Sequence, residues 1–360
     1  MSLNKRRLDN QVYRLLIALS LSLLIFLCLL IRAGAVSVFT HMRDFRLAAM
    51  ALTMLFIDFT VPLRVIQWHV LLPKNKTVKP FRVLQSLLLG YIGNSLFPMG
   101  GGDLFKTYHL SATARLPFST VLASVALIRL QDMIVVLLIV VSASVLAAGL
   151  PAAAPLVDGL NSARVVAFVV VLVACFLVLM CFRGRSTSGR LLNRYLPRIG
   201  ILFSRFVDPF SEGLAAAVAH PYRLVWAQVL AVSCWLLFMA APIPLLLDLG
   251  LPLGQALICA VILTGAVNLA LLLPITPAGL GTYHVVCVLV LSAFATDIPY
   301  DQRLAFAFVS HAIGVIGPAL LGIPVLPLLF TYRGSLKTSV GTQESSLPSL
   351  PENKERTSNA

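Results

Sequence analysis

The sequence predicts an all-α, polytopic helical membrane protein. Of its 360 residues, 59% are hydrophobic and only 12% are charged, and soluble domains carry about twice that charged fraction. Several apolar segments run for 17 residues or more without a charged side chain, and a spanning helix needs about 20 predominantly apolar residues. A soluble enzyme, a disordered protein and a disulfide-framed secreted module are excluded, because polar groups could not cover so much apolar surface.

Six segments are apolar and long enough to cross the bilayer. They are Leu15–Ile31, Leu47–Leu72, Phe118–Ala148, Val165–Phe182, Leu224–Leu247 and Leu304–Phe330. Basic residues precede the first segment, as in a signal peptide. Its apolar stretch of 17 residues is nevertheless longer than the usual signal core of about 7–15 residues, so we expect an uncleaved span.

Two further apolar regions are interrupted by proline and glycine. The first runs from Val83 to Phe97, continues through Pro98 and Gly100–Gly102, and ends with Asp103–Leu110. The second contains Ala256–Leu273, then a break with Pro274, Pro277, Gly279 and Gly281, then Thr282–Ala295. Each region is expected to form a broken helix or a hairpin of two short helices.

Basic residues predict the orientation of the chain. Segments 1–14, 73–82, 183–223 and 331–360 carry 19 Lys and Arg, whereas segments 32–46, 149–164, 248–254 and 296–303 carry 5. The positive-inside rule therefore predicts cytoplasmic termini in a plasma (inner) membrane protein. The broken regions, 83–117 and 255–303, must then each enter and leave on one side. They become two re-entrant hairpins of opposite orientation within a single membrane domain, 1–335. Residues 336–360 are expected to be a disordered cytoplasmic tail.

The two breaks also share a pattern of asparagine, apolar residues, proline and then glycines. Asn94 and Pro98 begin it in the first region, and Asn268 and Pro274 begin it in the second. Similar breaks in oppositely oriented halves are typical of inverted-repeat transporters, in which broken helices form the site near the membrane midplane. Coincidence is the alternative, since proline and glycine are common in membrane helices.

Charged residues inside the spans need an explanation, because insertion of one costs about 2.5–3.5 kcal/mol. Arg129 and Asp132 are three residues apart on one helical face, where they can pair. The pair is either structural, or Arg129 contacts an anionic headgroup and Asp132 holds it in place. Asp58 and Arg64 are six residues apart and share no face, so no joint role is predicted for them.

Asp103 and Lys106 repeat this spacing after the first break. Asp103 is expected to cap the short helix Leu104–Leu110, and capping alone could explain it. Lys106, one turn later, could instead reach a phosphate. Gly100–Gly102 would allow close backbone approach, and the amides at a helix start attract anions.

The second break offers fewer polar groups. Thr276 and Pro277 are suited to begin a helix, and Gly279 and Gly281 provide backbone access. His284, like His311, lies in apolar surroundings, where a hydrogen bond between helices is more typical than proton transfer.

Several motifs are absent. The six cysteines lie in apolar runs without a metal-ligand spacing, and the chain has no Walker motif, no H-E-x-x-H and no convincing catalytic triad. We therefore expect neither metal nor cofactor, no nucleotide-driven pump within this chain, and no nucleic-acid partner. An enzymatic activity stays open, with a transporter favoured.

The motifs around the two breaks resemble those of a known family. The pattern Asn94-x-x-x-Pro98-x-Gly100-Gly101-Gly102-Asp103-x-x-Lys106, followed by Arg129-x-x-Asp132 and by Pro274 with Gly279-x-Gly281, is similar to the lysylphosphatidylglycerol synthase transmembrane-region family, also called the flippase-like domain. That family includes the membrane half of the multiple-peptide-resistance-factor proteins. The resemblance covers roughly residues 10–335 and implies lipid translocation without aminoacyl transfer.

Two positions depart from the family pattern. Ile128 stands where the family often has a glutamate before the arginine, and His284 stands where a glutamate often follows the second break. A charge relay through those glutamates, and the identity of the lipid, are therefore not implied.

The leading hypothesis is a flippase-like translocator of an anionic phospholipid, a glycolipid or a polyprenyl-phosphate lipid. One alternative is a membrane-embedded transferase acting on a polyprenyl or glycolipid phosphate, with Asp103, Asp132 or His284 as base. Another is a membrane partner that holds a soluble lipid-modifying enzyme through the Arg-rich segment 183–205. The predicted substrate-binding residues are Asn94, Pro98, Gly101, Gly102, Asp103, Lys106, Arg129, Asp132, Asn268, Pro274, Gly279, Gly281 and His284.

Overall fold

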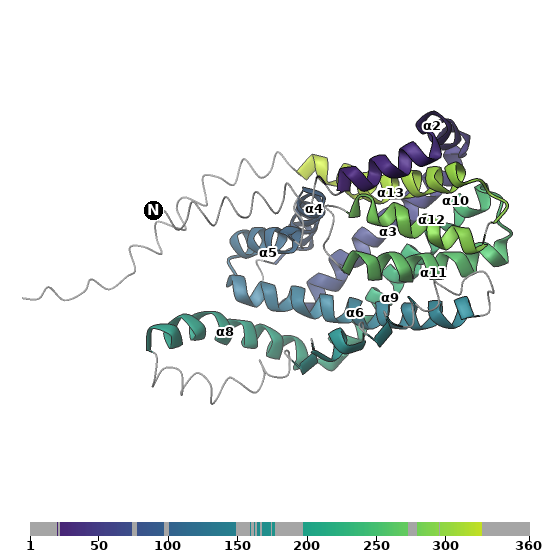
Figure 1. Cartoon of the computed structure of the whole chain (residues 1–360). Coiled ribbons are helices and arrows are strands. Elements are labelled where there is room, and N and C mark those ends of the chain that lie inside the picture. Colours follow the sequence, from purple (N-terminus) through teal and green to yellow (C-terminus); the bar gives the residue numbers. More distant parts are fainter. Residues whose placement is uncertain are drawn as a thin grey trace, which may run out of the picture.

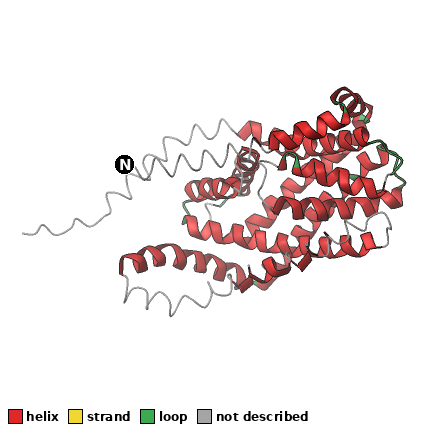
Figure 2. Cartoon of the chain, viewed as in Figure 1, coloured by secondary structure: helices red, strands yellow, loops and turns green. Residues whose placement is uncertain are grey.

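Apolar segments fold as helices in a membrane because a helix satisfies its own backbone N–H and C=O groups, which lipid cannot do. The computed structural model describes residues 20, 22–73, 78–96, 101–148, 159, 162, 164–165, 168–173, 175–176, 197–272, 279–294 and 296–325. Figure 2 shows helices joined by short loops, and no strand, in this described part. The protein is an all-α polytopic membrane protein.

Five helical segments of the described chain are long and apolar enough to cross a membrane. Four are single helices, and the fifth joins a long helix to a short one through a turn at Ala241–Pro242. They are α3 (Leu47–Leu71), α6 (Phe118–Ala148), α9 (Pro221–Ala240) with α10 (Ile243–Asp248), α11 (Leu253–Leu272) and α13 (Tyr300–Gly322), which continues into the 3-10 turn η3 (Ile323–Val325).

These segments agree with three predicted spans closely. The structure starts and ends α6 where the sequence predicts, and α3 ends one residue early. Helix α13 begins four residues early, at Tyr300, and ends at Gly322, eight residues before the predicted Phe330. Half of the predicted span Val165–Phe182 lies outside the described residues, as does the whole tail 336–360.

The N-terminal region differs from the prediction. A helix covers Ser22–Ala33, and α2 (Ala35–Asp44) follows it at an angle of 83°. Segment 32–46, predicted as an outer loop, is thus largely helical. Gly34 makes the bend possible, because its φ of +78° is one that side-chain-bearing residues rarely adopt. The earlier part of the predicted first span, before residue 20, is not described.

Both broken regions form helical hairpins. The first contains α4 (Pro80–Leu96) and α5 (Gly101–Ala114), and the second contains α11 and α12 (Thr282–Phe294). At a rise of 1.5 Å per residue, α5 and α12 are about 20 Å long, shorter than the roughly 30 Å hydrocarbon core. The second hairpin is asymmetric, because α11 is long enough to cross alone.

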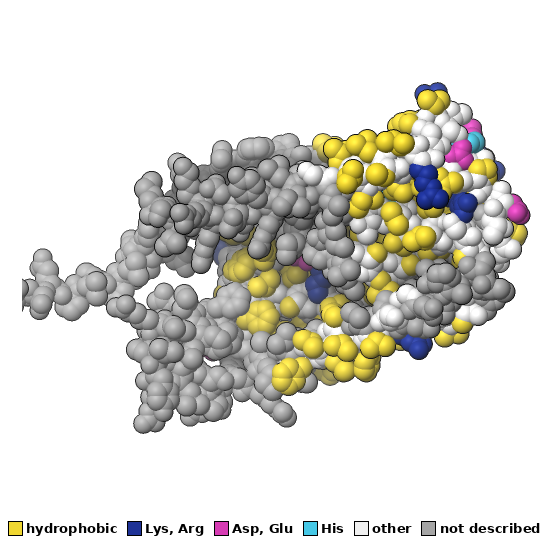
Figure 3. Space-filling model, in the orientation of Figure 1, with side chains coloured by type: hydrophobic (Ala, Val, Ile, Leu, Met, Phe, Trp, Pro, Cys, Tyr) yellow, Lys and Arg dark blue, Asp and Glu magenta, His cyan; other side chains and the backbone are white. Residues whose placement is uncertain are grey.

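Three described segments that the positive-inside rule places on one side, 32–46, 248–254 and 296–303, do lie together. At one end of the bundle the backbone N–H of Arg46 donates to Asp248 Oδ2 over 2.6 Å, and Ser37 donates to Asp301. Figure 1 shows this end at the right, beside α2, and Figure 3 shows most of the visible acidic side chains there. At the other end, Arg223 donates to the backbone oxygen of Leu72 over 2.9 Å.

Helices α4 and α5 pack closely through glycines. A Cβ atom on Gly102 would lie 2.1 Å from the backbone oxygen of Gly90 and 2.5 Å from Asn94 Oδ1, and one on Gly93 would lie 2.9 Å from the Cα of Gly102. The backbone N–H of Gly102 donates to Asn94 Oδ1 over 3.0 Å. No larger residue fits at this crossing, so the glycine run sets how closely the two helices approach.

The expected helix cap at Asp103 is wrong. Helix α5 begins at Gly101, so Asp103 lies inside its first turn and not before it. Asn94 from the neighbouring helix satisfies one of the free amides instead. Once that amide has a partner, the helix can begin three residues earlier than a cap at Asp103 would require.

The apolar core is divided between the two hairpins. One cluster surrounds the first hairpin and includes Trp68 and Leu110. A second cluster joins α11, α12, α13 and α2, and includes Leu291 and Phe306. A small third cluster contains Trp235 of α9.

The glycine crossing predicts a specific sensitivity. We expect Gly102→Ala to destabilise the protein by about 1–3 kcal/mol, because the new methyl group would overlap the backbone of α4. Thermal unfolding of purified protein in detergent would measure the loss. Gly254→Ala is the matched control, since a Cβ there meets no atom within 4 Å. Equal unfolding temperatures for the two variants would contradict this packing.

Candidate functional site

A cluster of charges lies beside the glycine crossing. Asp103 of α5 pairs with Lys106 one turn later, with 2.8 Å between Oδ1 and Nζ. It also pairs with Arg129 of α6, with 2.5 Å between Oδ2 and the guanidinium nitrogen. Asp103 thus neutralises one cation on its own helix and links α5 to the central helix α6.

A second ion pair lies on the same helix α6. Asp132 Oδ1 accepts a hydrogen bond from Arg64 of α3 over 2.6 Å and another from the indole Nε1 of Trp235 over 3.0 Å. Arg64 also donates to Gln67 over 2.9 Å. The side chains of Arg64 and Asp132 are only 11% and 10% exposed, so one buried carboxylate connects α3, α6 and α9.

The predicted pair between Arg129 and Asp132 is wrong. The two share a helical face, yet each binds a charge on another helix: Arg129 binds Asp103 and Asp132 binds Arg64. The observed pairs also give Arg64 of α3 and Asp103 of α5 a partner on another helix, which a pair within α6 would not do. The partner of Arg64 was not predicted, because Asp132 is 68 residues away in the sequence.

The combined cluster carries a net positive charge. Three cations (Arg64, Lys106 and Arg129) stand against two carboxylates (Asp103 and Asp132). Arg129 is the accessible member, with 51% of its side chain exposed, whereas Lys106 is 10% exposed. The Lys106 ammonium also lies 5.4 Å from the ring centroid of buried Trp68. Only Arg129 can therefore readily offer its guanidinium to an incoming anion.

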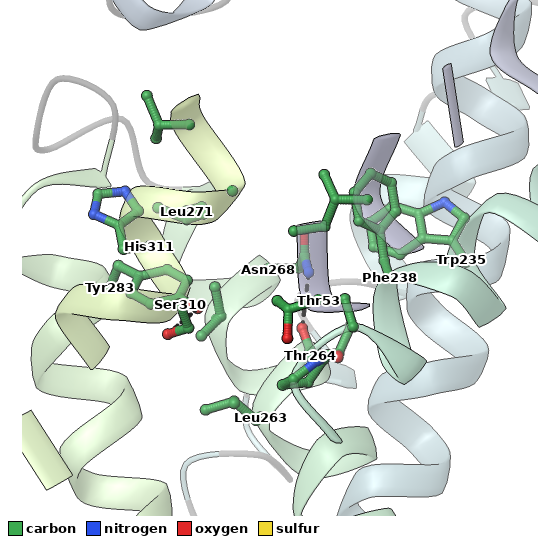
Figure 4. A pocket seen from close by; sticks show the side chains of 16 residues that line it. Thr53, Trp235, Phe238, Leu263, Thr264, Asn268, Leu271, Tyr283, Ser310 and His311 are labelled. Atoms are coloured by element: carbon green, nitrogen blue, oxygen red, sulfur yellow. Dashed lines mark hydrogen bonds between the residues drawn. The ribbon is translucent and has the colours of Figure 1, made fainter. Parts of the chain in front are cut away.

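A cavity of about 340 Å³ opens between α3, α9, α11, α12 and α13. Its volume lies in the range of small-molecule pockets, and none of the described residues that line it is an Asp, Glu, Lys or Arg. Figure 4 shows Tyr283, Ser310 and His311 on one side, with Trp235 and Phe238 on the other. Trp235 thus lines the cavity with its ring and binds Asp132 with its indole nitrogen, so a single side chain separates the cavity from the charge cluster.

A few polar groups interrupt the apolar cavity wall. Asn268, which the sequence predicts as a site residue, lies here and donates to the backbone oxygen of Thr264 over 2.8 Å. Tyr283 donates to Ser310 Oγ over 3.1 Å, and its ring stacks on His311 with centroids 4.6 Å apart. Tyr283 could not be identified as a site residue from the sequence, because a single tyrosine in an apolar helix belongs to no recognisable motif.

The other predicted residues of the second break are packed inside the protein. Gly279 and Gly281 have positive φ angles. Their free faces, however, meet Leu271 and Ile25. His284 is 1% exposed, accepts a hydrogen bond from the N–H of Gly281 over 3.3 Å and lies among aromatic rings. A contact between these residues and a ligand stays a prediction.

The structure therefore brings part of the predicted site together. Asn94, Gly102, Asp103, Lys106 and Arg129 form one group, with Gly101 at the start of α5. Pro98 and Pro274 lie outside the described residues. Among the described residues, no group of three or more metal-ligating side chains is placed to hold an ion.

The buried ion pair predicts strong coupling between α3 and α6. Asp132→Asn and Arg64→Gln should each destabilise the protein by about 3–5 kcal/mol, because each leaves one buried charge without its counter-charge. The double variant should lose less than the sum of the two, by about 0.5–3 kcal/mol. A double-mutant cycle of unfolding free energies in detergent would measure this coupling, and additive losses would contradict the pair.

The chain can also be compared with known proteins. A relative named Glycosyltransferase AglD, from Haloferax volcanii, is 24% identical over 251 residues. The match spans 63% of this chain but only 40% of that relative. No solved structure matches. A family model described as the lysylphosphatidylglycerol synthase TM region matches residues 12–322. Because this match covers most of the chain, the protein belongs to the lysylphosphatidylglycerol synthase transmembrane-region family.

Proposed function

We propose that the protein moves a lipid with an anionic headgroup between the leaflets of the plasma membrane, with both of its termini in the cytoplasm. The observation that carries this proposal is the net positive charge cluster of Arg64, Lys106 and Arg129 with Asp103 and Asp132. Charges inside membrane segments are costly and usually mark a pathway for a polar substrate. Arg129, half exposed, would contact the headgroup phosphate.

The cavity supports a substrate with both polar and apolar parts. It has an apolar wall with a few hydroxyl and amide groups and is separated from the charge cluster by Trp235. A headgroup at the cluster and a hydrocarbon chain near the cavity would suit an acyl or prenyl lipid. The candidate substrates are an anionic phospholipid, a glycolipid and a polyprenyl-phosphate lipid.

The opposed hairpins supply an element that could move. The short helices α5 and α12 belong to hairpins whose ends lie at opposite ends of the bundle. In transporters built this way, rocking of one hairpin or bundle against the other alternately opens the site to each side. We propose such alternating access for this chain, with the two hairpins acting as re-entrant elements.

A transferase reaction is the second candidate, because the relative from Haloferax volcanii is named as a glycosyltransferase. A base would be needed, and Asp103, Asp132 and His284 are the groups available in the two motifs. Each already has a partner: Asp103 binds Lys106, Asp132 binds Arg64, and His284 accepts from Gly281. Transfer by purified protein that is lost when these three are replaced would favour this reading over transport.

Loss of the exposed guanidinium should slow lipid exchange. We expect Arg129→Ala to reduce leaflet exchange of an anionic lipid about 10-fold or more, which corresponds to about 1.4 kcal/mol and to the loss of one charge-assisted hydrogen bond. Proteoliposomes containing a fluorescent phosphatidylglycerol, with dithionite added outside, would measure the exchange rate.

Arg43→Ala is the control for this experiment. Arg43 is an exposed arginine on α2 that forms no ion pair within the described part of the chain, and it lies at the far end of the bundle from α5 (Figure 1). Equal exchange rates for the Arg129 and Arg43 variants would remove the cluster from the mechanism. If wild-type protein accelerates none of the three lipid classes, the transport proposal itself fails.

The cavity gives a separate prediction. Gly314 lines it, and a Cβ at this position meets no atom within 4 Å. Gly314→Phe should therefore fill the cavity without unfolding the protein, and exchange should fall at least 10-fold. Gly254→Phe, which also meets open space, tests the effect of an added ring elsewhere. Unchanged exchange in the Gly314 variant would show that substrate does not use this cavity.

A further inference from the structure

Asp58 lies in the middle of the spanning helix α3 with its carboxylate against α13. It is the twelfth of the 25 residues of α3, about 16 Å from the start of the helix. A Cβ atom on Gly317 of α13 would lie 2.9 Å from Asp58 Oδ1. That oxygen is buried and has no hydrogen-bond partner among the described residues.

Asp58 differs in this respect from the two carboxylates of the charge cluster. Asp103 and Asp132 both have cationic partners, whereas no ion pair with Asp58 occurs in the part of the chain that the structure describes. An unpaired carboxylate at mid-membrane is costly, and such residues face a functional cavity or hold an ion. A charge that the protein does not neutralise must be neutralised by something else.

Two prolines free further oxygen atoms near Asp58. Pro62 lies inside α3 and Pro318 inside α13. Proline has no N–H, so each removes the hydrogen bond to the carbonyl four residues earlier. These carbonyls belong to Asp58 itself and to Gly314. In transporters, carbonyls freed by helix breaks coordinate Na⁺ or accompany a proton site.

The cavity lies beside this position, although Asp58 is not among the residues that line it. Two of its lining residues are close in sequence to the contact between Asp58 and Gly317. Ile57 directly precedes Asp58 on α3, and Gly314 is three residues before Gly317 on α13. An ion at Asp58 would therefore sit at the edge of the space that we assign to substrate.

The cations on the described helices that pack against α3 have partners other than Asp58: Arg82 donates to the backbone oxygen of Thr113, Arg129 binds Asp103, Arg223 donates to the backbone oxygen of Leu72, and Arg303 donates to Ser292. Arg64, on α3 itself, is bound to Asp132 of α6. The acidic group of α10, Asp248, binds Arg46 at the end of the bundle. Three other titratable groups lie on the helices packed against α3, and each has a partner. His311 of α13 stacks on Tyr283, and Tyr91 of α4 interacts with Arg64. Cys234 of α9 donates to the backbone oxygen of Thr60.

We propose that Asp58 binds a monovalent cation, either a proton or Na⁺, between α3 and α13. A proton would bind the carboxylate alone, whereas Na⁺ would also use the freed carbonyl oxygens, which are the hard ligands it prefers. In a translocator the ion would couple transport to an ion gradient. That coupling rests on the proposed function, but the binding site does not.

Chemical labelling of the purified protein tests the site without any transport assay. Dicyclohexylcarbodiimide adds only to protonated carboxyl groups, and peptide mass spectrometry locates the adduct. In Na⁺-free potassium buffer at neutral pH, wild-type protein should be labelled at Asp58, whereas Asp297, which is exposed, should not. Asp58→Asn should remove this label, and Asp297→Asn should leave it unchanged.

A Na⁺ titration then separates the two ions. Labelling that falls as Na⁺ replaces K⁺ at constant pH and ionic strength identifies a Na⁺ site, and labelling that depends on pH alone identifies a proton site. Binding of ²²Na⁺ to wild type and to Asp58→Asn provides a second readout that does not depend on access of the reagent. Absence of both Asp58-specific labelling and Asp58-dependent ²²Na⁺ binding would overturn the proposal.

Transport is measured last, so that the two proposals fail separately. If wild-type proteoliposomes accelerate lipid exchange and an imposed pH or Na⁺ gradient changes the rate at least 3-fold, Asp58→Asn should abolish the gradient effect. Asp58-specific binding in a protein that moves no tested lipid would leave the ion site standing and reject the transport proposal.

Discussion

The buried carboxylate of Asp132 is the interaction on which the arrangement of the helices depends. It accepts hydrogen bonds from Arg64 and Trp235, so it joins α3, α6 and α9 at one point. In lipid, packing gains little from the hydrophobic effect, because the surrounding chains are as apolar as the side chains. Polar contacts of this kind therefore specify which helices are neighbours and in which rotation they meet.

The glycine crossing of α4 and α5 places the rest of the cluster on this frame. Because Gly102 lies directly on the backbone of α4, α5 is held close to the bundle, and Asp103 reaches Arg129 one turn of α6 before Asp132. The two ion pairs thus use successive turns of one helix. Moving α5 away from α4 would break the Asp103–Arg129 pair but not the Arg64–Asp132 pair. A movement of α5 could therefore change the first ion pair while the second keeps α3 and α6 together.

The helices could be predicted from the sequence more fully than the contacts between them. Length and apolarity define α3 and α6 almost to the residue and place α13 with larger differences at both ends, and the distribution of basic residues correctly groups the described segments 32–46, 248–254 and 296–303 at one end. The partners of Arg129 and Asp132 could not be predicted, because the nearest opposite charge in sequence is not the nearest in space. Helix α2 was not predicted, because its residues are a mixture of polar and apolar ones and the sequence does not reveal the bend at Gly34 that separates it from the preceding helix. Tyr283 and Trp235 became site residues only through the cavity.

A single physical rule accounts for both the stable and the functional parts of this membrane domain. Polar groups in lipid need partners, and the polar side chains that join helices here follow that rule: Asn94 binds a helix amide, and Asp103 and Asp132 bind cations. Arg129 follows it only in part, since half of its side chain is exposed. Asp58 does not follow it within the described residues. Helix packing accounts for the polar groups that already have a partner in the protein. Arg129 and Asp58 are therefore the groups to which we assign a substrate and an ion as partners.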